Sequence, residues 1–285
     1  MTETAPNARV VRALTTDRRI RLAAMNASPL WDGLRRGHPG LSAEACSQLV
    51  ELMVATLLLQ SRNFFSERLQ ILIKGSGQAK ALMIDSWPEG DVRGLLDPAP
   101  GVVQGPWVQA PGTLSVMRSN AQGAPYIGSL ELVEGPIATQ IEAYLLQSEQ
   151  TPASLTLWCD PETGMAGGLL AEPLPDCPRE RLQTLVHAIE GLEVVPNWER
   201  DPEFLLRWIN QGEGAEILAS TEVRYQCRCT KDSLMDTFGA FPAERVAELF
   251  QAGDPMEVQC DYCGKAYQIS ASELQAKRGL PRAQD

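Results

Sequence analysis

A strongly apolar segment at residues 41–63 has the spacing of a helix. Ser42 is suited to cap its first turn, because a serine oxygen can accept a hydrogen bond from a free backbone N–H. Apolar side chains recur along it at helical intervals, at Cys46, Leu49, Val50, Met53 and Leu57. Since apolar positions occupy several faces of this helix, we expect it to lie at the centre of a core.

Short apolar or alternating runs follow this helix and predict strands. They lie at residues 68–73, 79–84, 114–117, 127–132 and 154–159, and turns containing glycine or proline separate them. Residues 136–146 return to a helical pattern. We therefore expect residues 1–178 to form an α+β domain that mixes helices with an antiparallel sheet.

The proline-rich segment 173–178 marks a boundary, and residues 179–222 then form a predicted helical linker. Its first short amphipathic helix carries Leu182, Leu185, Val186, Ile189 and Leu192 on one stripe. Its second begins after Asp201 with Pro202 and carries Phe204, Leu205, Trp208 and Ile209. Helices this short are marginal by themselves, so we expect both stripes to pack on the N-terminal sheet and to be released easily.

Residues 223–285 form a small predicted third domain. Two short helical patterns lie at 233–238 and 242–251, and strand-like residues 256–259 and 266–269 flank a tight turn at Gly264. A segment of this size buries little apolar surface, so it usually needs a metal or disulfides to fold.

Four of the seven cysteines lie in this third domain, as Cys227-Arg-Cys229 and Cys260-Asp-Tyr-Cys263. Thiolates at this density hold a soft metal, form disulfides or alternate between the two, and Zn²⁺ prefers a closed tetrahedron of sulfur ligands. We predict one zinc ion per chain at these four residues. Its binding free energy, roughly 10–16 kcal/mol for structural zinc in small peptides, exceeds what so small a core supplies, so losing the metal should unfold the domain.

The cysteine spacing leaves two interpretations of the metal site open. Zinc-bound thiolates remain reactive towards peroxide or hypochlorous acid, and a sulfenic acid condenses with the nearest thiol. Such a site can therefore lose its metal on oxidation and regain it on reduction. An inert structural zinc ribbon has the same spacing. The other cysteines, Cys46, Cys159 and Cys177, are scattered, and Cys46 is expected in the core.

Charge and hydropathy narrow the class of protein. A formal net charge of −11 and a pI near 4.8 argue against a nucleic-acid partner, because binding to phosphates is driven by clustered lysine and arginine. The N-terminal residues lack the layout of a secretory signal, and no uninterrupted apolar run of about 18 residues predicts a membrane span. We therefore expect a reducing, cytoplasmic location and no membrane partner, and there paired cysteines indicate metal binding or redox switching.

Four segments of the chain carry a resemblance to a known family. Two contain the cysteines, Tyr225-Gln-Cys227-Arg-Cys229-Thr and Val258-Gln-Cys260-Asp-Tyr-Cys263-Gly-Lys-Ala-Tyr267. The others are Tyr144-Leu-Leu-Gln-Ser148-Glu149-Gln150-Thr-Pro and Ala166-Gly167-Gly168-Leu-Leu-Ala-Glu-Pro-Leu-Pro175. Together with the length and the order of the domains, they resemble the heat-shock protein 33 family, the bacterial redox-regulated 33 kDa chaperonins.

The resemblance implies a chaperone that holds unfolding proteins without ATP and is not an enzyme. It implies that the zinc-bound, reduced form is inactive, and that oxidation pairs Cys227 with Cys229 and Cys260 with Cys263, releases zinc and unfolds the third domain and the linker. The active form is then a homodimer that holds clients until an ATP-dependent foldase takes over. We hypothesise that clients bind the linker stripes, at Leu182, Leu185, Val186, Phe204, Leu205, Trp208 and Ile209.

Two other functions remain open at this point. One is a thiol-disulfide oxidoreductase that uses Cys260 and Cys263, although such motifs lie at a helix start in a βαβ unit and this pair lies in a terminal knuckle. The other is a zinc-ribbon adaptor without redox switching, which would keep its metal after treatment with peroxide.

Overall fold

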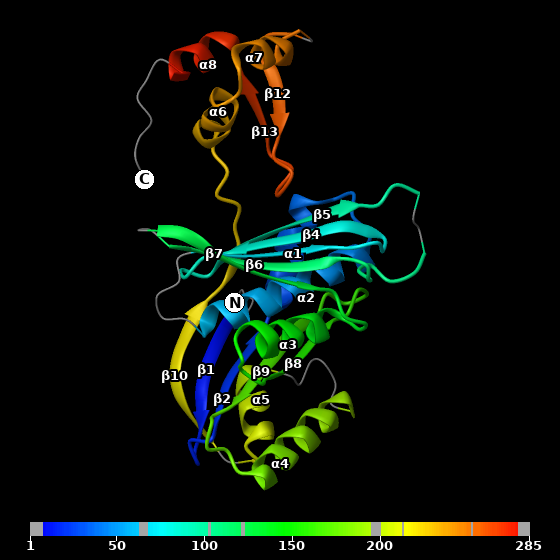
Figure 1. The fold of residues 1–285 in the computed structure, drawn as a ribbon, viewed down its shortest axis with the longest axis vertical. Coiled ribbons are helices and arrows are strands. Elements are labelled where there is room, and N and C mark those ends of the chain that lie inside the picture. Colours follow the sequence, from blue (N-terminus) through cyan, green and yellow to red (C-terminus); the bar gives the residue numbers. More distant parts are fainter. Residues whose placement is uncertain are drawn as a thin grey trace, which may run out of the picture. The chain divides into compact units, whose positions relative to one another are not determined.

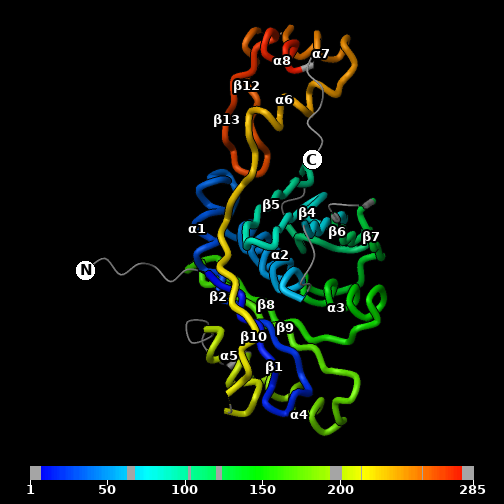
Figure 2. The backbone as a smooth tube through the Cα atoms, turned by 90° about the vertical axis from the view of Figure 1, so that its left-hand side faces the viewer, coloured from blue at the N-terminus to red at the C-terminus, as the bar shows by residue number. Residues whose placement is uncertain are grey.

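The computed structural model describes residues 8–62, 68–101, 104–120, 123–194, 201–212, 214–251 and 253–278 (Figures 1 and 2). The chain divides into two compact units, Met1–Gln226 and Cys227–Asp285. Antiparallel sheets and helices make up the first unit, so the predicted α+β class is confirmed. Residues 179–222 lie in the first unit. Their identity as a separate linker therefore stays a prediction about stability.

Five strands of the first unit form one antiparallel sheet. In spatial order they are β10 (Ala215–Glu222), β1 (Arg9–Thr15), β2 (Ile20–Asn26), β9 (Ala166–Pro173) and β8 (Ser154–Cys159). The sequence predicted only β8. The central strands β2 and β9 are buried almost throughout, so they lack the alternation of apolar and polar residues that marks a strand with one exposed face.

Six strands form the second sheet. In spatial order they are β11 (Arg224–Tyr225), β5 (Asp91–Pro98), β4 (Ala79–Ser86), β3 (Arg68–Lys74), β6 (Thr113–Asn120) and β7 (Gly123–Glu131). Neighbouring strands are antiparallel except the β11–β5 pair, which is parallel. Strands β3, β4, β6 and β7 are those predicted from the sequence, while β5 and β11 were not.

Helix α2 (Ala43–Ser61) packs against strands of both sheets and forms the centre of the first unit (Figure 1). The Ser42 side chain accepts a hydrogen bond from the Ala45 backbone N–H at 3.2 Å, as the capping prediction required. Fourteen of its nineteen residues are buried, so the expected central helix is confirmed; Asn63, at the end of the predicted range, lies outside the described residues. By length and composition α2 would also suit a membrane span, but 78% of its most apolar stretch is buried inside the fold.

Two further helices flank this centre. They are α1 (Ser28–Gly37), which was not predicted, and α3 (Ile137–Ser148), which matches the predicted helix at 136–146. Glu149, just past α3, accepts a hydrogen bond from Arg62 at 2.6 Å and pairs with Arg118, and Arg62 also donates to Glu172 at 2.7 Å. This nearly buried network ties the ends of α2 and α3 to β9 and β6. It gives Glu149, in one of the segments that carried the family resemblance, a structural role.

The outer face of the five-stranded sheet is covered by the predicted linker helices, α4 (Arg179–Glu190) and α5 (Pro202–Ile209), with a 3₁₀ turn η1 (Gly191–Val194) after α4. Alternate strand residues face opposite ways, so Val10 and Met25 pack towards α2 while Val11 and Leu22 pack towards the linker helices. The predicted docking of the stripes on the N-terminal sheet is thus found for α5, for α4 through Leu185 and Ile189, and for η1 through Leu192. The linker also contains β10, which the sequence did not predict.

In the second unit, the structure describes three helices and one hairpin. They are α6 (Lys231–Gly239), α7 (Ala243–Leu249), β12 (Met256–Gln259), β13 (Ala266–Ile269) and α8 (Ala271–Arg278). Figure 2 shows the hairpin running beside the helices of this unit. Apart from Cys260, the buried apolar residues described here are three, Val246, Ile269 and Leu274. A core of this size supplies little stability, which agrees with the sequence argument that the unit needs a further support.

Candidate metal centre

The first cysteine pair lies in an extended segment between β11 and α6. Thr230 caps α6 by accepting a hydrogen bond from the Ser233 backbone N–H at 3.0 Å, and the Ser233 hydroxyl accepts from the Thr230 N–H at 3.1 Å. Cys229 therefore directly precedes a well-capped helix start. The partial positive charge at a helix N-terminus favours thiolates there.

The second pair lies in the turn of the β12–β13 hairpin. The Cys260 backbone N–H donates to the Lys265 carbonyl at 2.9 Å, and the Gly264 N–H donates back to the Cys260 carbonyl at 2.8 Å. Gly264 has a φ of 70°, a left-handed conformation that glycine adopts without steric cost. The strands and the turn have the bounds that the sequence predicted.

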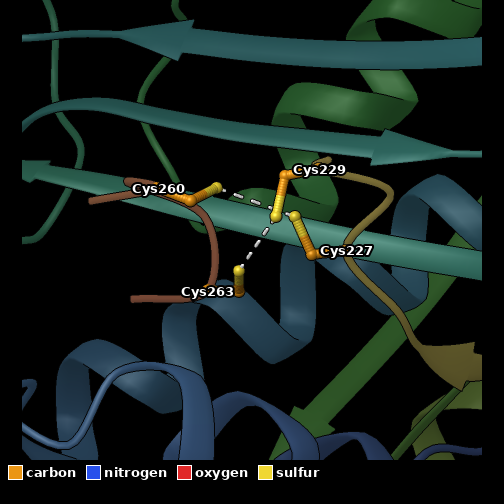
Figure 3. Close-up of side chains that lie close together, drawn as sticks. All are labelled: Cys227, Cys229, Cys260 and Cys263. Atoms are coloured by element: carbon orange, nitrogen blue, oxygen red, sulfur yellow. Dashed lines mark hydrogen bonds between the residues drawn. The ribbon is translucent and has the colours of Figure 1, made fainter. Parts of the chain in front are cut away.

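The four sulfur atoms point towards one another from these two loops (Figure 3). The Sγ atoms of Cys227 and Cys260 are 3.8 Å apart, and those of Cys229 and Cys263 are 3.4 Å apart. All four lie within 4.8 Å of one another. A tetrahedron with zinc–sulfur bonds of about 2.3 Å has sulfur–sulfur edges of about 3.8 Å. The donor set and its spacing therefore fit a four-coordinate soft metal ion.

The four thiols influence each other's ionisation. Burial raises the pKa of Cys229, but hydrogen bonds from Tyr267 and from the neighbouring thiols outweigh it, so that pKa lies below its ordinary value. Burial and the charge of Cys227 raise the pKa of Cys260, and burial together with Cys229 raises the pKa of Cys263. A cation is what allows all four sulfurs to be negative at once.

Tyr267 extends the cluster beyond the four sulfurs. Its hydroxyl lies 3.2 Å from the Cys229 Sγ and donates to the Cys229 carbonyl at 3.0 Å. The hydrogen bond to Cys229 raises the pKa of the Tyr267 phenol, so this group keeps its proton. Spacing rules for metal ligands give no signal for this contact, because it depends on how β13 faces the Cys229 loop.

The cysteines outside the cluster lie in the first unit. Cys46 is fully buried in the core as predicted, and burial raises its pKa. Burial also raises the pKa of Cys159, while Cys177 is half-buried. All seven cysteines are free of disulfide bonds in this structure. The cysteines that lie close enough together to share a metal ion are therefore those of the second unit.

The seven predicted client-binding residues do not share one environment. Leu185, Leu205 and Ile209 are buried against the five-stranded sheet, and Phe204 and Trp208 are half-buried against the same cluster. Leu182 is half-buried. Val186 is 50% exposed and does not share the packing, so its predicted place on the docked stripe is wrong. The side chain points to solvent because α4 packs through Leu185, Ala188 and Ile189.

Three comparisons place the chain among known proteins. The family model described as Hsp33 protein matches residues 8–270. The 33 kDa chaperonin of Lactiplantibacillus plantarum is 28% identical over 291 residues, covering 94% of this chain and 96% of its own. That of Cyanothece sp. is 30% identical and covers 93% and 94%. The crystal structure of the 33 kDa chaperonin from Thermotoga maritima has a TM-score of 0.81 at 21% identity, covering 96% of this chain and 98% of that one, which supports the fold.

Proposed function

Because this chain belongs to the Hsp33 family of chaperones, we propose that it is redox-regulated and holds unfolding proteins without using ATP. In this proposal the reduced, zinc-bound form is inactive, and oxidation of the clustered cysteines activates it. One observation carries the proposal: a four-sulfur cluster in a unit with a very small core. A fold that depends on metal-bound thiolates is lost when those thiolates are oxidised.

The metal part of the proposal assigns one zinc ion per chain to Cys227, Cys229, Cys260 and Cys263. Bound zinc would supply no redox chemistry of its own and would join the Cys227 loop to the β12–β13 hairpin. The sulfur spacing supports all four ligands. Three of the four side chains are only half-buried, so small oxidants can reach them.

The redox part of the proposal pairs Cys227 with Cys229 and Cys260 with Cys263 in the oxidised form. Each disulfide takes two electrons from two thiols, and the peroxide that accepts them is reduced to water. In the reduced arrangement close sulfur contacts also join the two pairs, Cys227 with Cys260 and Cys229 with Cys263. Sulfurs in a disulfide no longer carry the charge that holds a divalent cation, so the metal that would join the two loops is lost as the disulfides form.

Release of the linker follows in this proposal because β10 is weakly held. It is an edge strand of the five-stranded sheet, and most of its side chains are exposed or half-buried. Through β11 it leads directly to Cys227. Backbone pairing with β1 is its main attachment, so it offers little resistance once the chain beyond it unfolds.

Apolar surface near the linker helices supports the client-binding part of the proposal. A groove of about 980 Å³ lies between α4 and α5 and is lined in part by Phe204, Trp208 and Ala188. The Phe204 and Trp208 rings stack with centroids 5.6 Å apart. If α4 and α5 leave the sheet, this surface and the apolar residues beneath it become available to an unfolding protein. The proposed client-binding residues remain Leu182, Leu185, Val186, Phe204, Leu205, Trp208 and Ile209.

The remaining partners follow from the family. We propose that the active form is a homodimer in the cytoplasm and that it passes its clients to an ATP-dependent foldase. The oxidoreductase alternative finds no support in the geometry, because Cys260 and Cys263 lie in a hairpin turn and not at a helix start. The relatives compared above are named chaperonins.

The test measures zinc release and chaperone activity on the same samples. Reduced protein should contain zinc and should not prevent aggregation of heated citrate synthase. After peroxide at raised temperature it should release the zinc and suppress aggregation, and reduction should reverse both changes. A protein that keeps its zinc under these conditions is a non-switching adaptor, and turnover in an insulin-reduction assay would indicate an oxidoreductase.

A further inference from the structure

Tyr267 connects the two halves of the sulfur cluster. It lies on β13, opposite Val258 on β12, in the hairpin that carries Cys260 and Cys263. Its hydroxyl, however, reaches the other loop, where it donates to the Cys229 carbonyl at 3.0 Å and lies 3.2 Å from the Cys229 Sγ. One side chain thus holds both the backbone and the sulfur of Cys229.

The direction of the Tyr267–Cys229 contact depends on the state of the sulfur. A phenol carries one proton, and a thiol can donate its own proton to the phenol oxygen while the phenol donates to the carbonyl. A metal-bound thiolate has no proton to give. The tyrosine is then the donor to both acceptors, and a hydrogen bond to an anion is stronger than one between neutral groups.

A hydrogen bond to a ligand sulfur reduces the availability of its lone pair to an oxidant. Hydrogen bonds donated to metal ligands by neighbouring side chains orient those ligands and tune the metal centre. The same hydroxyl also keeps the Cys229 Sγ in the neighbourhood of Cys263, 3.4 Å away. The Tyr267 contact therefore favours the arrangement in which Cys229 serves as a metal ligand.

We propose that Tyr267 is a positioning residue that stabilises Cys229 as a metal ligand and sets how much oxidant is needed to release the metal. This inference rests on the proposed zinc-dependent redox switch. Oxidation of a metal-bound thiolate begins when peroxide transfers one oxygen to the sulfur; the O–O bond breaks, and the second oxygen leaves as hydroxide, which a proton from solvent converts to water. The resulting sulfenic acid then condenses with the thiolate of the neighbouring cysteine, and its hydroxyl group leaves as a second hydroxide.

The test replaces Tyr267 with phenylalanine in the full-length, reduced, zinc-loaded protein. Tyr267→Phe keeps the ring and its place opposite Val258 but removes the hydroxyl. Zinc released after a fixed dose of hydrogen peroxide is followed with a chromogenic chelator. We expect release to be about three- to tenfold faster and zinc affinity, measured by competition with a chelator, to be about tenfold weaker.

Two control variants separate the hydroxyl contact from other effects. Tyr126→Phe removes a phenolic hydroxyl from an exposed site on β7 in the first unit and should leave both measurements unchanged. Lys265→Met removes the ammonium group that lies 5.1 Å from the Tyr267 ring centre and should change them less than about twofold. If Lys265→Met reproduced the whole effect of Tyr267→Phe, the cation and not the hydroxyl would be responsible, and the inference would be wrong.

The outcomes distinguish this inference from the function it rests on. Wild-type protein that binds no zinc, or keeps it after oxidation, contradicts the proposed switch itself. If the wild type releases zinc on oxidation and Tyr267→Phe releases it with the same kinetics, only the proposed role of Tyr267 is overturned. Should the phenylalanine variant fail to fold, 3-fluorotyrosine incorporated at position 267 makes the hydroxyl a better donor, so release must become slower; unchanged or faster release would reject the inference.

Discussion

Cys260 is the most buried of the four clustered cysteines, at 7% exposure, and its sulfur faces Cys227. Cys260→Ser replaces a sulfur ligand with a hydroxyl that is a poor ligand for zinc and leaves three thiolates around an open position. We expect the zinc content, measured by atomic absorption on reduced protein, to fall from about one ion per chain to a small fraction of that.

Cys177→Ser is the matched control for this substitution. Cys177 is half-buried in the first unit, outside the cluster. The Cys177→Ser protein should bind zinc as the wild type does. A stoichiometric zinc content in Cys260→Ser would mean that Cys260 is not a ligand.

A second prediction at the residue scale concerns Glu51 and the pH dependence of stability. Burial on α2 raises its pKa to about 7, although a hydrogen bond from the Cys159 backbone N–H opposes the shift. Because the folded protein holds this proton more tightly than the unfolded chain, the stabilisation is complete at low pH and is lost as pH rises through about 7. Glu51→Gln stays neutral at every pH.

The Glu51 prediction is checked by urea unfolding at pH 5 and pH 8, followed by tryptophan fluorescence. All six tryptophans precede Cys227, so the signal reports the first unit. We expect Glu51→Gln to be more stable than the wild type by less than about 1 kcal/mol at pH 5 and by about 2–3 kcal/mol at pH 8. An equal difference at both pH values would show that ionisation of Glu51 does not contribute.

Single residues differ in how far their roles follow from the sequence. The spacing of the cysteines predicted a cluster of four sulfurs, because few other arrangements use thiols at that density. The burial of Cys46 followed from its helical spacing. The contact of Tyr267 with Cys229 did not follow, since it joins residues 38 positions apart through the register of a hairpin. The prediction for Val186 was wrong because helical spacing marks a wider apolar face than the part of α4 that packs on the sheet.

At the scale of elements, the attachment of α5 to the five-stranded sheet can be tested through Leu205. This side chain is fully buried against the sheet. Leu205→Ala leaves a cavity that costs about 2–5 kcal/mol, and we expect faster hydrogen exchange across 202–209 in the reduced protein. Val186→Ala, on the exposed side of α4, should cost less than about 0.5 kcal/mol. Equal exchange at 202–209 in both variants would mean that this packing does not hold the linker in place.

Strands β9 and β10 were missed by the sequence analysis for different physical reasons. In β9 the glycines Gly167 and Gly168 weaken any strand pattern, yet they permit close approach. A Cβ at Gly168 would lie 2.5 Å from the Val54 side chain of α2, and one at Gly167 would lie 2.5 Å from the Met25 carbonyl. Glycine in a strand here allows another element to approach closely. Strand β10 was missed because its side chains are mostly exposed and its place is set by backbone pairing with β1.

At the scale of the whole molecule, the two units differ in what stabilises them. In the first unit, α2 is buried between two sheets, and Arg62 at its C-terminal end forms ion pairs with Glu149 and Glu172. The described part of the second has three buried apolar residues at its core, six half-buried apolar residues packed against them, and charged pairs on its surface, such as Lys231 with Glu273. Surface pairs contribute about 0–1 kcal/mol each. If the proposed zinc is bound, most of the free energy of folding of the second unit should therefore come from it.

This difference predicts a selective response to metal removal. A strong chelator under reducing conditions removes the proposed zinc without forming disulfides. We expect hydrogen exchange to become fast across 231–251 and 253–278, because roughly 10–16 kcal/mol of binding free energy is withdrawn from a small core. Helix α2 should keep its protection, since its packing involves no metal ligand. Adding zinc back should restore the slow exchange, whereas unchanged exchange after removal would mean that the second unit folds without its metal and that oxidation cannot act by dismantling it.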